Sequence, residues 1–193
     1  MSPEHLQALR AGEPWAVSAF YADHAPMVLG WCIRMGGPHL DPEDAAHAVF
    51  ETALGRLSSF RGEAKLSTWL YAITRRVLAN LRRRAALRRF IGLDRVPEAS
   101  DPHDTHHELE RLRERRAVQH TLERLPDTSR EVLVLCDLEE RSAPVVAEML
   151  EIPVGTVYSR LHKARRLFKA AALREGLVVR EGQVLKLVEG GQP

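Results

Sequence analysis

A chain of 193 residues, 45% of them hydrophobic, can build the cores of one or two domains. No apolar run approaches the roughly 18 residues of a membrane span, and the first residues lack a signal-peptide layout, so we expect a cytoplasmic protein without membrane insertion. The net charge of +2 excludes no class of binding partner, because basic and acidic residues are segregated along the chain. Cys32 and Cys136 lie far apart in apolar helical contexts, which favours two packed thiols over a disulfide or a metal site.

The N-terminal third is predicted to be helical. Residues 4–35 form one pattern with a break near residues 11–14, and Trp15, Ala19, Phe20, Met27, Trp31 and Ile33 are its expected core positions. The next helix begins with Asp41 as N-cap and Pro42 at its first position. On one face of that helix lie Asp44, His47 and Glu51. Such a polar stripe is either solvated or a docking surface.

A loop over residues 58–66 leads into a long basic helix. Ser67 is expected to cap it, and it should run from Thr68 to about Arg88 with Leu70, Ile73, Val77 and Leu81 buried. The outward side is predicted to carry Thr68, Tyr71, Arg75 and Arg82, flanked by Trp69, Arg76, Asn80 and Arg83. Seven arginines and no acid lie between Arg75 and Arg89, which suits a nucleic-acid backbone with unpaired bases stacked nearby. The alternative is a solvated helix with Trp69 and Tyr71 in the core.

The charge then inverts over residues 94–110, which hold six acids against the single base Arg95. Pro97 and Pro102 argue against regular structure, so we predict a flexible acidic linker between two helical domains. His103, His106 and His107 lie close together, but without a cysteine they make a poor metal site, and we expect neither a metal nor a cofactor.

Helical structure should resume near residue 107 and end at Pro126. Thr128–Glu131 reads as a capping box for the next helix, which is expected to bury Val132, Leu133, Leu135 and Leu138. Residues 176–188 alternate weakly and are either a small hairpin or a disordered tail. The predicted fold class is therefore all-α.

Two helices joined by a tight turn end the predicted second domain. Ser142 and Pro144 begin a short helix, and residues 151–154 turn the chain into a basic helix. The second helix buries Val157, Leu161, Ala164, Phe168 and Ala171, whereas Ser159, His162, Lys163 and Arg166 face outward beside Tyr158 and Lys169. Such a cationic, outward-facing second helix is typical of a helix-turn-helix that enters the DNA major groove.

Four motifs in this order resemble the bacterial sigma-70 family, specifically its extracytoplasmic-function (ECF) group. They are Asp41-Pro-Glu-Asp-Ala-Ala-His-Ala-Val-Phe50, Phe60-Arg-Gly-Glu-Ala-Lys-Leu-Ser-Thr-Trp-Leu-Tyr71, Leu125-Pro with Arg130-Glu-Val-Leu133, and Pro153-Val-Gly-Thr-Val-Tyr-Ser-Arg-Leu161. The resemblance implies sigma region 2 over residues 1–89, a linker over 90–106, region 4 over 107–174 and a tail over 175–193. It also implies a non-enzymatic protein that gives core RNA polymerase its promoter preference.

The resemblance assigns roles to the three surfaces. Asp44, His47 and Glu51 match the helix that grips the clamp coiled coil of the largest polymerase subunit, and the flap is the other expected polymerase contact. The part that melts the −10 element and holds its single strand is matched by Phe60, Arg61, Lys65, Ser67, Thr68, Trp69, Tyr71, Arg75, Arg76, Asn80 and Arg83. The part that reads the −35 element as duplex is matched by Thr156, Tyr158, Ser159, Arg160, His162, Lys163 and Arg166. Most relatives also have an anti-sigma partner, and the acidic linker matches a segment that threads toward the polymerase active site.

This chain departs from the family pattern at His47, Arg76, Tyr158 and Val145, where glutamine, asparagine, a base and an acid are usual. Two other classes of protein are compatible with parts of the sequence. A stand-alone helix-turn-helix regulator would bind DNA without polymerase and would have no use for the Asp44 stripe. A metal-dependent enzyme could use the nine histidines, but no HExxH motif or glycine-rich phosphate loop supports it.

Overall fold

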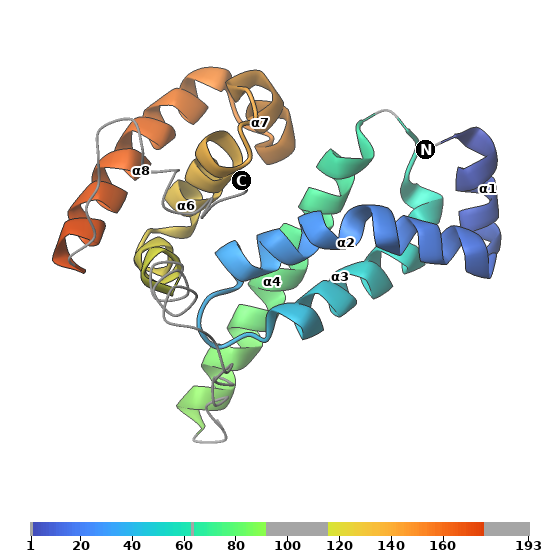
Figure 1. Cartoon of the computed structure of the whole chain (residues 1–193), viewed down its shortest axis with the longest axis horizontal. Helices are drawn as coiled ribbons and strands as arrows, with labels where there is room; N and C mark the ends of the chain where they lie inside the picture. The colour runs from blue at the N-terminus through green and yellow to red at the C-terminus, as the bar shows by residue number, and fades with distance from the viewer. Residues whose placement is uncertain (1, 63, 92–115, 176–193) are drawn as a thin grey trace, which may run out of the picture. The chain divides into compact units, whose positions relative to one another are not determined.

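The structure is a computed structural model that describes residues 2–62, 64–91 and 116–175 (Figure 1). These residues form helices and the turns between them, with no strand among them, so the all-α prediction is confirmed. The chain divides into two compact units, Met1–Arg95 and Val96–Pro193. Most of the expected linker, with its three histidines, and the tail beyond residue 175 lie outside the described residues.

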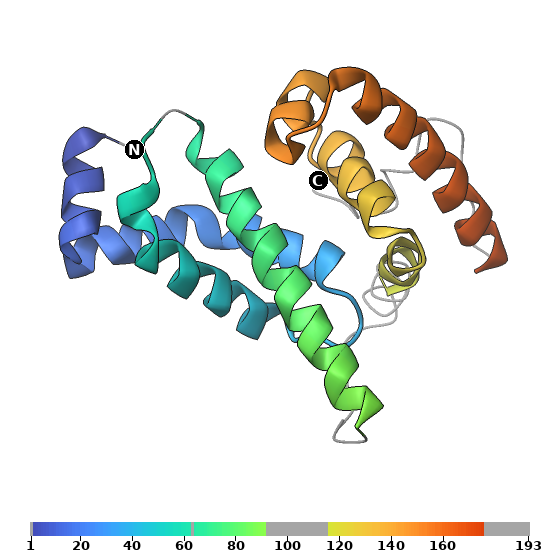
Figure 2. The ribbon, with the colours of Figure 1, turned by 180° about the vertical axis from the view of Figure 1, so that it is seen from behind.

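The first unit is a bundle of helices. Its elements are α1 (Pro3–Ala11), α2 (Pro14–Gly36), α3 (Pro42–Gly55), the 3₁₀ turn η1 (Leu57–Ser59) and α4 (Leu66–Phe90). Helices α2, α3 and α4 each pack against the other two, and α1 packs on α2 (Figures 1 and 2). The bundle thus brings α3 and α4 into one rigid frame while each keeps a solvent-facing side.

Local capping explains where the first helices begin and end. The Oδ1 atom of Asp41 accepts hydrogen bonds from the backbone N–H groups of Glu43 and Asp44, both at 2.9 Å, and Pro42 follows the cap. This confirms the predicted start of α3. Gly12 has φ +75°, the left-handed conformation that favours glycine, and it ends α1 where the break was expected.

The core of the first unit is built around aromatic side chains of α2. Trp31 is fully buried and meets Tyr71 of α4 edge-on, with ring centroids 5.1 Å apart. Phe20 meets Phe50 of α3 edge-on at 5.8 Å. Two expected core positions are wrong, because Trp15 is 58% exposed and Ile33 is 44% exposed.

The start of α4 also differs from the prediction. Its N-cap is Lys65 and the helix begins at Leu66, so Ser67 lies inside the first turn and does not cap it. Tyr71 does not face outward: it is fully buried, and its hydroxyl donates to the sulfur of Met35 at 3.5 Å. Tyr71 therefore belongs to the core, which was the alternative for this residue.

The second unit is also helical. Its described elements are a helix over residues 116–123, α6 (Asp127–Leu133), the π-helical turn η2 (Val134–Leu138), α7 (Ala143–Leu150) and α8 (Val154–Arg174). Both α6 and α7 pack against α8. Val132, Leu133 and Leu135 are buried as expected, and Leu138 is half-buried.

The predicted capping box at residues 128–131 is wrong. A capping box would make Thr128 the N-cap and Ser129 the first helical residue, but the helix begins two residues earlier, at Asp127, with Pro126 in the N-cap position, and Glu131 is buried. Another interaction stabilises this turn. The buried guanidinium of Arg130 donates to the backbone oxygens of Leu122, Glu123 and Leu125 at 2.8, 2.9 and 3.0 Å, so it caps the carbonyl end of the preceding helix.

The turn between α7 and α8 matches a helix-turn-helix. Ser142 occupies the N-cap position of α7, although its side chain makes no capping hydrogen bond. Glu151 ends α7 in the left-handed conformation, with φ +55°, and the N–H of Ile152 donates to Ala147 O at 3.0 Å. Pro153 then precedes the first turn of α8.

Candidate nucleic-acid and protein interfaces

Helix α8 separates its apolar and polar residues cleanly. Val157, Leu161, Ala164 and Phe168 are buried as predicted, and Ala172 is buried where Ala171 was expected. Ser159, His162, Lys163 and Arg166 are exposed, as is Tyr158 at 60%, whereas Thr156 and Arg160 are half-buried. The structure therefore brings the sequence-predicted residues of α8 together on one solvent-facing side.

One arginine of α8 is used to hold the helix in place. The guanidinium of Arg165 donates two hydrogen bonds to the carboxylate of Asp137, at 2.6 and 2.9 Å, and Asp137 is only 5% exposed. The hydrogen bond to Asp137 raises the pKa of Arg165 further above its usual range. Asp137 lies in the π-helical turn η2, so this bidentate pair fixes the middle of α8 against that turn.

Helix α4 presents a second cationic side. Arg75, Arg76, Asn80 and Arg83 are exposed, and the guanidinium of Arg83 donates to the side-chain oxygen of Asn80 one turn earlier. Ser67, Thr68 and Trp69 at the start of the helix are half-buried. Except for the buried Tyr71, the α4 residues that the sequence assigned to a nucleic-acid face are at least partly accessible.

The loop before α4 is shaped by its aromatic residue. Phe60 is 7% exposed and packs on Trp69, with ring centroids 5.2 Å apart, while its backbone oxygen accepts a hydrogen bond from Arg10 of α1 at 2.6 Å. Phe60 therefore anchors the loop by packing its ring on Trp69. Arg61 and Lys65 are exposed and remain the cations that the loop offers to a ligand.

Two further arginines of α4 stabilise the bundle. Arg82 donates to Met35 O at the carboxyl end of α2, at 2.7 Å. Arg89 reaches the turn between α2 and α3, where its guanidinium lies 2.6 Å from His39 Nε2. The outward role predicted for Arg82 is therefore wrong, because its guanidinium caps a neighbouring helix.

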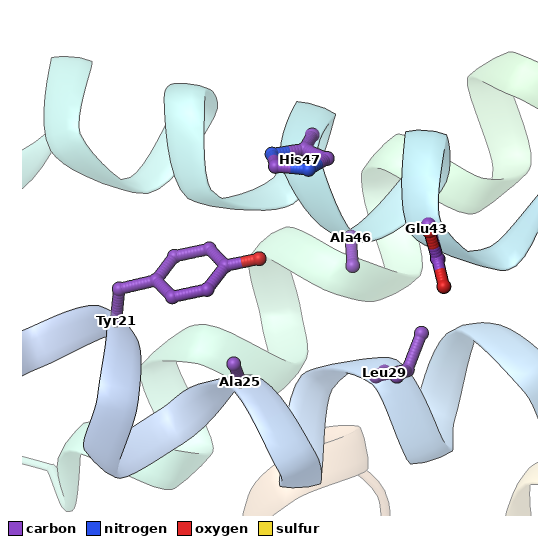
Figure 3. A pocket seen from close by; sticks show the side chains of 6 residues that line it. All are labelled: Tyr21, Ala25, Leu29, Glu43, Ala46 and His47. Carbon is purple, nitrogen blue, oxygen red and sulfur yellow. The ribbon is translucent and has the colours of Figure 1, made fainter.

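The exposed face of α3 carries the predicted acidic stripe. Asp44, His47 and Glu51 are all exposed, and the His47 ring stacks on Tyr21 of α2 with centroids 6.0 Å apart and an interplanar angle of 25°. Beside this pair lies an open pocket of about 280 Å³ (Figure 3), lined by Tyr21, Ala25, Leu29, Glu43, Ala46 and His47. The stripe thus borders a small hollow with an apolar floor.

Comparisons with known proteins agree with both units. The family model for sigma-70 region 2 matches residues 20–88, and the model for sigma-70 region 4 matches residues 115–168. The ECF RNA polymerase sigma-E factor of Haemophilus influenzae is 32% identical over 179 residues, which cover 85% of this chain and 91% of that protein. The chain belongs to the sigma-70 family, in its ECF group.

Other relatives share this assignment. The ECF RNA polymerase sigma factor SigW of Bacillus subtilis is 29% identical over 181 residues, covering 88% of this chain and 95% of SigW. Among solved structures, CnrH in complex with the cytosolic domain of CnrY has a TM-score of 0.61 and 25% identity, covering 86% of this chain and 93% of CnrH. The protein is therefore a sigma factor that directs RNA polymerase to promoters, and a stand-alone regulator is not favoured.

The two thiols of this sigma factor are shielded. Burial raises the pKa of Cys32 to about 12, and burial with the nearby Asp137 raises that of Cys136 to about 11. Both cysteines are free, so they pack as protonated thiols. Within residues 2–62, 64–91 and 116–175, no three side chains of the metal-binding types converge on one site, and no helix is long and apolar enough to cross a bilayer.

Three residues that hold these surfaces in place were not assigned a role by the sequence. Arg130, Asp137 and Tyr21 act through contacts with residues 5 to 28 positions away or on another helix. Helical periodicity reports only which side of a helix a residue occupies. The one sequence signal for the structural role of Asp137 was the presence of an acid inside an apolar run.

Proposed function

We propose that this ECF sigma factor works through three surfaces. Residues 1–89, within the first unit, dock on the clamp coiled coil of the largest polymerase subunit and open the −10 element. Residues 107–174, within the second unit, read the −35 element as duplex and meet the flap, with residues 90–106 as the linker and 175–193 as a tail. The protein carries out no bond chemistry and acts in the cytoplasm.

Helix α8 is the proposed reader of the −35 element. An isolated helix fits the major groove, where its short donors reach base edges and its cations reach phosphates. Ser159, His162 and Lys163 would contact bases, and Arg166 would contact phosphate. Tyr158, 60% exposed, adds an aromatic surface for thymine methyl groups or sugars, while Thr156 and Arg160 line the edge of the contact.

The loop over residues 60–67 and the exposed side of α4 are the proposed −10 site. Arg75, Arg76 and Arg83 would bind the phosphates of the separated strand, with Asn80 between them. Trp69, Ser67 and Thr68 would line the place where an extruded base is held. Extruding a base costs a few kcal/mol, and stacking on an aromatic side chain returns roughly 1–3 kcal/mol per base, so base capture offsets strand separation.

The acidic stripe of α3 supports docking to polymerase. Asp44 and Glu51 present carboxylates to solvent on the side of α3 that does not pack on the bundle, and His47 lies between them. A basic partner helix would meet complementary charge there. The solved complex of CnrH with the cytosolic domain of CnrY supports the further proposal that this sigma factor is held by an anti-sigma partner.

The observation that carries the proposal is that one unit exposes an acidic stripe on α3 and a cationic side on α4. A module that only binds DNA would need the cationic side of α4 but not the acidic stripe of α3. The test is run-off transcription from genomic fragments of the host by core polymerase with and without the purified chain. We expect discrete start sites only when the chain is present, and Asp44→Lys with Glu51→Lys should abolish them. Equal initiation by core polymerase alone would refute the proposal.

A further inference from the structure

The short helix α1 reaches the loop before α4 through one side chain. Arg10 lies in the last turn of α1, and its guanidinium donates a hydrogen bond to the backbone oxygen of Phe60 at 2.6 Å. The two residues are 50 positions apart in the sequence. Figures 1 and 2 show α1 and the turn η1 at the same end of the bundle. Because the region 2 family model matches residues 20–88, this contact joins the loop to a helix that the model does not include.

Helix α1 is itself fixed to α2, so it offers a firm support for Arg10. Leu9, the residue before Arg10, is 3% exposed. The ring of His5 meets that of Trp15 with centroids 5.2 Å apart, and His5 Nε2 lies 3.4 Å from Ala16 O. The backbone of α1 is therefore held by contacts at two places that do not involve Arg10, and the bond from Arg10 restrains the loop.

Two helices hold Phe60 by different groups. Its buried ring packs on Trp69 of α4, and its carbonyl oxygen is bound by Arg10 of α1. The carbonyl of Phe60 and the N–H of Arg61 belong to one planar peptide group. Fixing the oxygen therefore also fixes the direction in which the chain leaves Phe60 and enters the loop that carries the exposed Arg61.

We propose that Arg10 is a positioning residue for base capture at the −10 element. It holds the Phe60 peptide, and through the Phe60 ring it keeps Trp69 in the geometry that receives the extruded base. Arg10 itself touches no DNA. A site that is already ordered loses less conformational freedom when its ligand binds, so more of the interaction energy appears as affinity. This inference rests on the proposed function, because Trp69 lines a base site only if that proposal holds.

The surroundings of Arg10 favour this local role over a general contribution to stability. Arg10 is exposed, and its bond to Phe60 is only partly buried. A hydrogen bond from such a side chain to a neutral carbonyl adds modestly to the stability of a whole unit, because water competes for both groups. The loop, in contrast, has few other restraints at this point, so losing the bond should alter the loop more than the bundle.

The test uses the full chain assembled with core polymerase and fork-junction templates with a single-stranded −10 element, taken from a promoter recovered by run-off transcription. Each base of the single strand is replaced in turn by an abasic site, and the position with the greatest loss for the wild-type chain marks the captured base. At that position Arg10→Met should reduce the preference for the intact base over the abasic site about fivefold. Arg10→Lys, which keeps a cationic donor, should restore most of the preference. Arg56→Met, which changes an exposed arginine of the same unit, is the matched control and should leave it unchanged.

Two further quantities separate positioning from other roles of Arg10. Affinity for core polymerase without DNA and the slope of template binding against salt concentration should both be the same for Arg10→Met and the wild-type chain. An unchanged base preference, including equal weakening on intact and abasic templates, would overturn the inference in favour of a purely structural role. A salt slope lower by about 1 would overturn it in favour of a direct phosphate contact. If the wild-type chain preferred an intact base at no position, base capture and with it the proposed function would be refuted instead.

Discussion

The two cationic helices of this sigma factor, α8 and α4, both use some of their arginines to hold the fold, but these arginines bind different kinds of partner. In α8 one arginine, Arg165, binds the buried carboxylate of Asp137, and the other cations project from the side away from the core. In α4, Arg82 and Arg89 bind other parts of the bundle while Arg75, Arg76 and Arg84 remain at the surface. The number of arginines in such a run therefore does not give the number of phosphate contacts, because some of the arginines hold in place the helix that presents the others.

The largest expected effect concerns an arginine that faces no ligand. Arg130→Met would leave three carbonyl oxygens near the end of the 116–123 helix without their donor. Removing a buried charged donor of this kind should lower the free energy of unfolding by about 3 kcal/mol. Thermal and urea unfolding of the full chain measure this loss, which should be confined to the second unit.

The matched control for that change is Arg124→Met. Arg124 is 48% exposed and forms an ion pair with Glu175 at 2.8 Å, so its loss should cost well under about 1 kcal/mol. Equal destabilisation by the two substitutions would contradict the capping role of Arg130.

The next effect separates base reading from general attraction on α8. His162→Ala and Lys163→Ala should each change discrimination among −35 variants by about tenfold, because each exposed side chain is proposed to reach base edges. Binding to core polymerase should be unchanged. The measurement is competitive binding of holoenzyme to a set of −35 variants, and a uniform loss on all of them would show that these residues contact only the backbone.

A smaller effect distinguishes two arginines seven residues apart on α4. Arg75→Ala should weaken promoter opening and lower its salt slope by about 1, because Arg75 is exposed on the proposed −10 side. Arg82→Ala should instead destabilise the first unit, since its guanidinium binds Met35 O. If the two variants gave the same change in salt slope, the division of roles within α4 would be wrong.

The smallest effect concerns pH. Burial lowers the pKa of His24 below its usual 6.5, so the unfolded chain takes up the proton more readily than the folded one. Stability supplied by the neutral ring is complete above pH 6.5 and is lost as the pH falls below it. His24→Gln should therefore flatten the loss of stability between pH 7.5 and 5.5 in urea unfolding. An identical acid-induced loss in the variant would exclude His24 as its source.

Sequence reasoning succeeded where local rules decide the structure. The cap of α3 by Asp41 depends on two backbone N–H groups within three residues, and the stripe of α8 depends on helical period alone. It failed where a distant residue decides. Tyr71 lies near the border of the core stripe of α4, and Trp31 of α2 is the residue that covers it. Trp15 and Ile33 are apolar but stay 58% and 44% exposed, although the Trp15 ring meets that of His5 of α1.

The site residues also divide into those set by local rules and those set by tertiary contacts. The exposed members of the three surfaces could be named from periodicity and from the family resemblance, because a charged residue opposite a core stripe faces solvent. The roles of Arg130 and Asp137 could not, because each bonds to a segment whose position depends on tertiary packing. The start of α6 at Asp127 was not predicted for a related reason. Arg130 lies within the segment that resembles a capping box, but its side chain caps the preceding helix.

Permanganate reactivity of thymines in the −10 element tests most directly whether the two units act on separate parts of one promoter. Holoenzymes carrying Lys163→Ala or Arg75→Ala are compared at protein concentrations that give equal promoter occupancy. The account predicts wild-type reactivity for Lys163→Ala, because its defect lies in finding the −35 element, and reduced reactivity for Arg75→Ala. Equal opening by the two variants at equal occupancy would contradict the division of labour between α8 and α4.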